Sequence, residues 1–252
     1  MSPTHLRFVV AISGVAVIAI TALTLALSPN TAAQRERAAV EEIVRDYLME
    51  NPEILVEMSN ALDVRQGAAE EAARNEALAE LGPDALVDPQ VAYVSGPDDA
   101  PVTVVEFFDY RCGFCKASLP ATRVAMENNE NVRFAFIEYP ILSPESIIAA
   151  HAAVAARRQP GKYVPFHIAL MEATGNLSRE RILNIAESIG LDVAQLEADM
   201  EDPAVADSIK ASHELADRLL VGGTPTFIIG GEFVIGEMSQ EELQQKIAEA
   251  QG

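Results

Sequence analysis

The sequence predicts an α/β domain that is interrupted by a helical insert and preceded by a separate helical segment. Two observations carry this prediction: helical periodicity gives way to β-branched and aromatic runs after Asp84, and the order of the later elements places strands on both sides of a long helical block. With 252 residues, 49% hydrophobic and 22% charged, the chain is long enough to bury a substantial core. These values exclude a wholly disordered, collagen-like or many-span membrane protein.

The charge balance is strongly acidic. Lys and Arg number 18 against 38 Asp and Glu, which gives a formal net charge of −20. A surface of this sign repels nucleic acid and anionic lipid headgroups. We therefore expect no nucleic-acid partner.

The first element is an apolar N-terminal run. Residues 8–27 carry no charge and follow His5 and Arg7, which is typical of an export signal or a membrane anchor. We assign residues 1–33 to this element and expect a protein of the periplasm or cell envelope. The small residues 31–33 permit cleavage, so a cleaved signal and a retained anchor both stay open. A buried core helix is the alternative, but such a helix would normally carry a polar stripe.

The second element, residues 34–82, shows helical periodicity without a strand signal. Its first helix has one apolar stripe, and Asn51 and Pro52 have the residue types of an N-cap and first helical position for the next. A segment of this size buries too little surface to stand alone. We expect homo-oligomerisation through the stripe; packing on the rest of the chain and a solvated linker helix are the alternatives. The stripe consists of Val40, Ile43, Val44, Tyr47 and Leu48.

The third element, residues 83–252, contains every strand that the sequence predicts. The strand at 102–109 has the apolar character of a central strand covered on both faces. The order is that of a thioredoxin-like fold with an inserted helical domain. The elements are a strand at 102–109, a helix to about 127, a strand at 132–138, a helical insert at about 143–220, strands at 225–229 and 232–235, and a helix from 239.

The two cysteines, Cys112 and Cys115, are separated by Gly113 and Phe114 directly after the first strand. A thiol at the first turn of the following helix lies among unpaired backbone N–H groups, which stabilise its thiolate by about 0.3–2 kcal/mol. Cys112 is therefore the expected attacking nucleophile. Cys115 lies on the same helical face and deeper, where it should be shielded and able to attack the first sulfur once a mixed disulfide forms.

Two other interpretations of the pair compete. A structural disulfide would close a very short loop and stabilise the fold little. A zinc half-site would need further ligands, but His151, His167 and His213 are widely spaced along the helical block. We expect no metal and no cofactor other than the redox-active disulfide, and we expect those histidines to be packing or surface residues.

Two further positions complete the candidate site. Pro225 cannot donate a backbone hydrogen bond at the start of a strand. A cis peptide between Thr224 and Pro225 would turn the backbone there, so that Thr224 can pair with an extended substrate. An ordinary trans turn is the alternative. Glu106 shares a strand face with apolar residues, so desolvation should raise its pKa and suit it to carry a proton for Cys115. The alternative is a carboxylate that faces water at the end of the strand.

Several motifs together resemble the DsbA-like family of bacterial envelope thiol–disulfide oxidoreductases, from about Val102 to Ile247. The resemblance implies that Cys112 is the nucleophile, Cys115 the resolving thiol, Thr224-Pro225 the cis-proline substrate loop and Glu106 the buried acid. It also implies client proteins with thiols or disulfides and a membrane redox partner that resets the cysteines. The motifs are residues 104–115 (VVEFFDYRCGFC), Gln159–Tyr163, Phe166-His167, Ile185–Asp192 and Gly223–Thr226.

The N-terminal segment has its own resemblance. Residues 47–55 (YLMENPEIL) are similar to the oligomerising segment of the ScsC-like copper-sensitivity suppressor branch. Members of that branch include trimers. The resemblance therefore implies a homo-oligomer, with a trimer as one form.

The residues between the cysteines depart from the strongly oxidising members, which carry Pro-His there. Phe114 neither donates a hydrogen bond nor brings positive charge to the Cys112 thiolate, so the reduced form is less stabilised and the protein a weaker oxidant. We therefore expect a disulfide isomerase or reductase. Arg111 partly restores positive potential, so a disulfide-forming oxidase is an alternative, as are a non-enzymatic Cu(I)-binding envelope protein and a scaffold.

Overall fold

The structure, a computed structural model, describes residues 29–252. The apolar run at residues 8–27, predicted as an export signal or anchor, lies outside the described residues. In the described part, no helix combines the length and the apolar character needed to cross a membrane. The chain packs as two compact units, one ending at Gln66 and the other running from Gly67 to Gly252.

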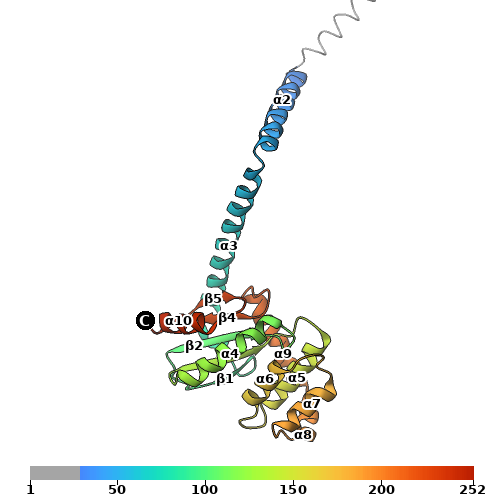
Figure 1. Ribbon diagram of the computed structural model, residues 1–252, viewed down its shortest axis with the longest axis vertical. Helices are drawn as coiled ribbons and strands as arrows, with labels where there is room; N and C mark the ends of the chain where they lie inside the picture. Colours follow the sequence, from blue (N-terminus) through green and yellow to red (C-terminus); the bar gives the residue numbers. More distant parts are fainter. Residues whose placement is uncertain (1–28) are drawn as a thin grey trace, which may run out of the picture. The chain divides into compact units, whose positions relative to one another are not determined.

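The first unit contains helix α2 (Pro29–Glu50) and the beginning of helix α3 (Glu53–Leu81) (Figure 1). Most of the apolar stripe is open to solvent in the single chain: Val40, Ile43, Val44 and Tyr47 are each 49–68% exposed. Asn51 does not act as expected, because its side-chain amide donates to the carbonyl oxygen of Tyr47 at 2.8 Å and so satisfies the end of α2.

The second unit is built on a five-stranded sheet of order β1-β3-β2-β4-β5. The central pair, β2 and β3, is parallel, and every other neighbouring pair is antiparallel. The sequence does not predict β1, because this edge strand has only four residues and little apolar alternation. The strands are β1 (Ala92–Ser95), β2 (Val102–Phe108), β3 (Val132–Glu138), β4 (Thr226–Ile229) and β5 (Glu232–Ile235).

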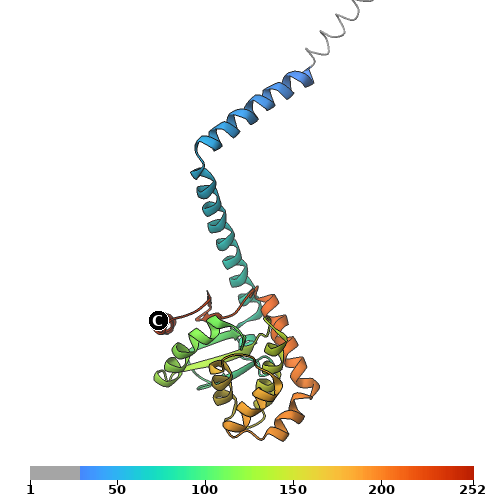
Figure 2. The same ribbon diagram turned by 45° about the vertical axis from the view of Figure 1, so that its right-hand side comes forward.

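Helices cover both faces of this sheet (Figure 2). Alternate residues of the central strands point to opposite faces, so each strand contributes to two apolar clusters. One face packs against α4 (Gly113–Asn128) and α10 (Gln240–Gln251), and the other against α9 (Pro203–Arg218) and the last turns of α3. Burial on both faces explains why β2 and β3 are almost continuously apolar.

The helical insert lies between β3 and β4, as the sequence predicts. Four of its five helices begin with a Ser or Asp side chain that accepts a hydrogen bond from a backbone N–H group of the first turn: Ser143, Ser178, Asp192 and Asp202. The predicted fold class, a thioredoxin-like α/β fold with a helical insert and N-terminal helices, is confirmed. The insert helices are α5 (Pro144–Ala156), α6 (Tyr163–Glu172), α7 (Arg179–Ser188), α8 (Val193–Met200) and α9.

Candidate active site

Cys112 is the N-cap residue of α4. Its backbone N–H donates to the carbonyl of Asp109 at 3.0 Å, which closes a tight turn between the end of β2 and the helix. Its Sγ donates to the carbonyl oxygen of Thr224 at 3.1 Å, although the two residues are 112 positions apart. The Thr224–Pro225 peptide bond is cis, which confirms that expectation. The fold therefore places the predicted substrate loop directly against the predicted nucleophile.

Both cysteines are free thiols and both are largely enclosed. Cys112 is 5% exposed and Cys115 is 1% exposed, so Cys112 is more covered than its expected role as the outer thiol suggests. The Thr224 carbonyl lies against its sulfur, whereas Gly113 and Phe114 beside it are exposed. Burial raises the pKa of Cys115 well above its ordinary value, and the neighbouring Glu106 carboxylate raises it further.

Glu106 lies on β2, on the sheet face that packs against α4. It is 4% exposed, so its carboxyl does not face water. Burial raises its pKa from 4.5 to about 8, and the hydroxyl of Thr122 on α4 partly offsets this rise. A carboxyl with a pKa of about 8 is partly ionised just above neutral pH. Beside a thiol of still higher pKa, its ionised form is suited to take a proton from that thiol.

A second buried acid, Glu138 at the end of β3, was missed by the sequence analysis. Its Oε1 accepts hydrogen bonds from the hydroxyls of Tyr110 at 3.1 Å and Tyr163 at 2.9 Å. Burial raises its pKa to about 8, and the positive charge of Arg157 opposes the rise. Glu138, like Glu106, is an acidic residue within an apolar strand, so the sequence carries the same signal for both residues. Only the fold, however, brings the two tyrosines to Glu138.

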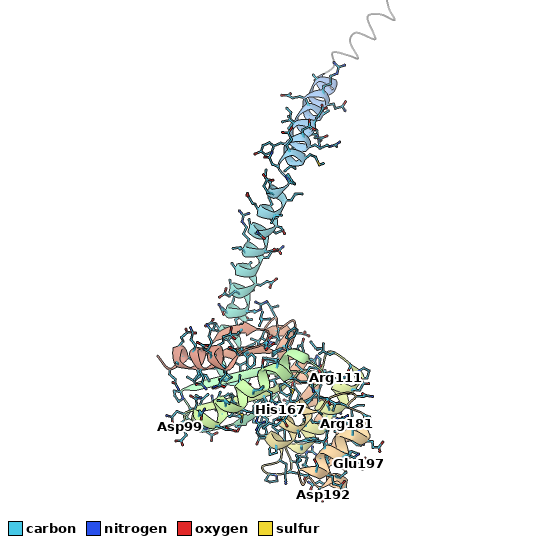
Figure 3. The ribbon with its side chains drawn as sticks, viewed as in Figure 1. Asp99, Arg111, His167, Arg181, Asp192 and Glu197 are labelled. Atoms are coloured by element: carbon cyan, nitrogen blue, oxygen red, sulfur yellow. The ribbon has the colours of Figure 1, made fainter. Side chains whose placement is uncertain are left out.

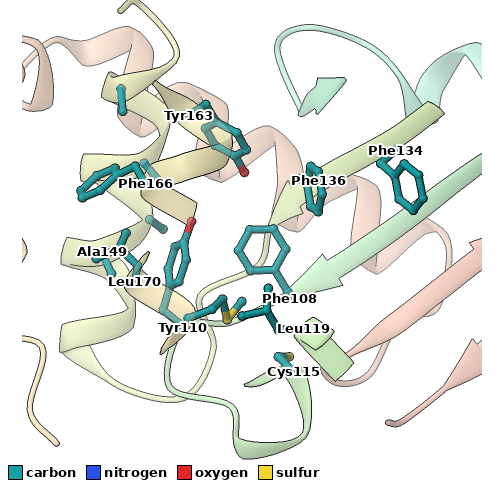
Figure 4. Packing of buried hydrophobic residues seen from close by; sticks show 14 of the residues in the cluster. Phe108, Tyr110, Cys115, Leu119, Phe134, Phe136, Ala149, Tyr163, Phe166 and Leu170 are labelled. Carbon is teal, nitrogen blue, oxygen red and sulfur yellow. The ribbon is translucent and has the colours of Figure 1, made fainter. Parts of the chain in front are cut away.

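This polar cluster continues into the insert. His167 on α6 places Nδ1 3.2 Å from the Tyr110 hydroxyl, and burial lowers its pKa to about 3. Its imidazole is therefore neutral at physiological pH. Figure 4 shows Tyr110, Tyr163 and Phe108 among the packed side chains between the sheet and the insert helices. Because Tyr110 lies two positions before Cys112, the cluster ties the active-site turn to the insert.

Asp109 is the other functional residue that the sequence analysis missed. Its buried carboxylate accepts from the Ser146 hydroxyl at 2.7 Å and from the backbone N–H groups of Arg111, Ile141 and Leu142 at 2.7–3.0 Å. These bonds hold the Cys112 turn against the loop after β3 and the start of α5. An Asp directly after a strand is a turn signal, but its distant partners are invisible in the sequence.

The described residues contain no cluster of three or more His, Cys, Asp or Glu side chains that could hold a metal ion. His151, His167 and His213 lie on three different helices, α5, α6 and α9. His167 belongs to the buried cluster, and His213 packs against the ring of Tyr139.

A Cys-x-x-Cys pair at the start of the helix that follows a central strand, beside a cis-proline loop, defines the class of thioredoxin-fold thiol–disulfide oxidoreductases. Residues 103–248 match the DSBA-like thioredoxin domain, and residues 36–69 match the Copper resistance protein ScsC N-terminal domain. The chain belongs to the DSBA-like thioredoxin domain family, whose members are thiol–disulfide oxidoreductases. The resemblance drawn from the sequence motifs, including the ScsC-like branch, is thereby confirmed.

Solved structures agree with this assignment. A thioredoxin-like oxidoreductase from Silicibacter pomeroyi DSS-3 is 41% identical, with 68% of this chain and 98% of that chain covered and a TM-score of 0.63. BcfH of Salmonella enterica Typhimurium is 30% identical, with 89% and 100% covered and a TM-score of 0.72. The latter match extends over most of the described residues.

A curated relative is much longer than the matched region. The Na(+)/H(+) antiporter NhaA 1 of Salinispora arenicola is 34% identical over 166 residues, which cover 65% of this chain and 25% of the antiporter. The chain thus spans about a quarter of the length of this and related antiporters.

Proposed function

We propose that the chain is an exported protein thiol–disulfide oxidoreductase that uses Cys112 and Cys115 as its redox pair and acts as an isomerase or reductase. The observation that carries the proposal is the Cys112 thiol at the N-cap of α4, in contact with the Thr224 carbonyl beside the cis Pro225. No cofactor is required, because the two thiols store and release the two electrons.

In the first step the Cys112 thiolate attacks one sulfur of a client disulfide. A Cys112–client disulfide forms, the client S–S bond breaks, and one client thiolate leaves. In reductase action Cys115 then attacks Cys112 Sγ, which forms the Cys112–Cys115 disulfide and releases the second client thiol; the client gains two electrons. In isomerase action a client thiol attacks the mixed disulfide instead, and no net oxidation occurs.

Cys115 must lose its proton before it attacks, and its raised pKa makes this costly. Glu106 is the group proposed to accept that proton, because it is buried beside Cys115 and its own pKa is about 8. Thr224 and Pro225 are proposed to hold the client backbone, since the turn leaves the Thr224 segment only partly buried beside the sulfur.

The direction of electron flow is inferred from Gly113 and Phe114. Phe114 is 63% exposed and offers no donor or charge to Cys112. The thiolate therefore lacks a stabilising contact that would make the pair strongly oxidising. We expect a reduction potential below the value of about −120 mV that is typical of the strong oxidant DsbA. A potential at or above that value would favour the alternative, an oxidase.

The N-terminal residues are proposed to set location and assembly. In this proposal residues 1–33 export or anchor the protein in the cell envelope, and residues 34–82 oligomerise. Residues 83–252 form the catalytic domain, whose cysteines are reset by a membrane redox partner. The exposed apolar stripe at 40–47 supports self-association, because its exposure in a lone chain favours aggregation. Several active sites in one oligomer, a trimer for example, would suit isomerisation, since a released client meets another site at high effective concentration.

Client trapping tests the redox pair. Cys115→Ser should accumulate covalent complexes between Cys112 and client proteins that a reductant dissolves. Cys112→Ser should abolish both trapping and the reduction of insulin disulfides. Insulin reduction that survives in Cys112→Ser would refute the assignment of the nucleophile.

A second candidate, Cu(I) binding, has one observation in its favour: the free thiols Cys112 and Cys115 lie within one turn of each other at the start of α4. Two soft thiolates at this spacing can hold Cu(I). Tight Cu(I) binding by the reduced chain, together with no reduction of insulin, would favour this candidate over the oxidoreductase.

A further inference from the structure

Positive charge gathers beside the active-site turn of this otherwise acidic chain. Arg111 precedes the nucleophile, Lys116 lies in the first turn of α4, and Arg181 lies on α7. Burial lowers the pKa of Lys116, and the positive charges of Arg111 and Arg181 lower it further. Figure 3 shows Arg111 and Arg181 on the same side of the domain.

Lys116 is held in place by the end of a helix. Its ammonium group donates to the carbonyl oxygens of Leu170 at 3.5 Å, Met171 at 2.8 Å and Ala173 at 2.6 Å, at the C-terminus of α6, so it offers a ligand its charge and no free donor. Carbonyl oxygens orient the ammonium group but do not cancel its charge. The carboxylate of Asp109 also lies near Lys116, but its oxygens already accept four hydrogen bonds.

The two arginines converge on the loop after α6. Arg111 donates to the carbonyl oxygen of Gly175. Arg181 lies beside the same glycine: its Nη1 is 3.6 Å from the position that a Cβ atom of residue 175 would occupy. Within residues 29–252, neither arginine nor Lys116 lies within 4.0 Å of a carboxylate in an ion pair. Their charges are therefore available to a ligand.

Two of these cations, Arg111 and Lys116, line a pocket of about 650 Å³, and Arg181 lies beside its Gly175 wall. Arg111 and Lys116 line it together with Gly175, and apolar side chains of α4 and α6 form much of the remaining wall: Leu119, Pro120, Val124 and Met171. Two glutamates line it as well: Glu172, whose charge is paired with that of Arg123 at 2.7 Å, and Glu127, so the cations outnumber the carboxylates by one among the lining residues. The pocket therefore combines unpaired positive charge near the cysteines with an apolar wall along α4.

We infer that this pocket binds a client segment that carries an acidic and an apolar residue close to the cysteine attacked by Cys112. The inference rests on the proposed function, since it names the class of client for that site. The net charge of −20 does not oppose it, because exposed charges beyond about 8–10 Å are screened at physiological salt while the three cations act at contact distance. The expected result is selection among clients near the site, not long-range attraction.

Three peptides test the inference. Each carries one cysteine, joined in a disulfide to 2-mercaptoethanol, a neighbouring leucine, and either Glu, Gln or Lys at one further position. The full-length reduced protein attacks the disulfide, Cys112 bonds to the peptide sulfur, and 2-mercaptoethanol leaves with its proton. We expect the Glu peptide to react roughly 3–10-fold faster than the Gln peptide, and the Lys peptide to react slowest, with the differences shrinking at high salt.

A matched pair of variants locates the preference. Arg181→Gln should reduce the ratio of the Glu to the Gln rate, whereas Arg179→Gln should retain it. Arg179 lies on the same helix as Arg181 and carries the same charge, but it is paired with Glu201. It is two residues from Arg181 in the sequence and therefore lies on a different face of the helix.

The outcomes test the client preference and the proposed oxidoreductase function separately. Equal rates for the three peptides, or a faster Lys peptide, would overturn the inference and leave the proposed function standing. A Glu preference that Arg181→Gln leaves unchanged would overturn the assignment to this pocket. No reaction with any peptide would refute the proposed function itself.

Discussion

The surroundings of Glu106 and Glu138 make an instructive comparison. The two acids lie on neighbouring parallel strands, in register with Phe136 and Phe108, and both face the layer beneath α4 and the insert. Burial raises both pKa values from 4.5 to about 8. Their partners differ: Glu106 lies beside the Cys115 thiol, whereas Glu138 accepts two tyrosine hydroxyls and lies near the charge of Arg157.

Burial sets the proton affinity of each carboxyl, while the groups around it decide its role. Glu138 has donors fixed to it from the active-site turn and from α6, so it holds these two parts together. Glu106 has the Thr122 hydroxyl and an ionisable sulfur beside it, and we propose that it exchanges a proton with that sulfur. Substitutions at these two positions should therefore have different consequences.

The largest expected effect is on the pH dependence of stability. Between pH 4.5 and about 8 the folded chain keeps the Glu106 proton and the unfolded chain loses it, so this residue lowers the free energy of unfolding as pH rises. Glu106→Gln cannot titrate. It should gain stability over the wild type across that window, by up to about 5 kcal/mol. Urea unfolding of both proteins at several pH values measures this gain, and a constant difference from pH 4.5 to 8 would contradict the role of burial.

The opposite effect is expected at the other acid. Glu138→Ala removes the acceptor of two buried tyrosine hydroxyls and leaves a cavity, so it should lower the free energy of unfolding by about 3–5 kcal/mol. Glu138→Gln keeps an oxygen for both hydroxyls and, like Glu106→Gln, no longer takes up a proton on folding, so it should lose far less stability than the Ala variant. Urea unfolding at pH 7 checks both expectations, with Glu130→Ala, an exposed glutamate, as the control. Equal losses in the Ala and Gln variants would show that the hydroxyl bonds are not the cause.

The smallest expected effect concerns catalysis. Glu106→Gln should slow the attack of Cys115 on a preformed Cys112–peptide disulfide by about 10–100-fold near pH 8, where the wild-type carboxyl is about half ionised, because the thiol then lacks its proton acceptor. Glu138→Gln, matched in chemistry and burial, should change this rate far less. Stopped-flow measurement of peptide release separates the two. A similar slowing in both variants would place the effect in the packing and not in proton transfer.

Much of the site could be predicted from local patterns. The spacing of Cys112 and Cys115 after an apolar strand predicts a thiol at a helix N-terminus, and the structure places Cys112 at the N-cap of α4. The apolar neighbours of Glu106 predict its burial and the rise of its pKa. Such features depend on residues a few positions apart, which share a strand face or helix turn by geometry alone.

Local sequence patterns were thus enough to predict the α/β class, the insert, the cysteine pair at the start of α4 and one buried acid. Only the tertiary structure decided that Cys112 lies against Thr224, that Asp109 binds the loop after β3, and that Glu138 meets Tyr110 and Tyr163. These contacts join residues 25 to 112 positions apart. Their partners are selected when the insert packs on the sheet, because buried polar groups must find donors and acceptors wherever the fold brings them.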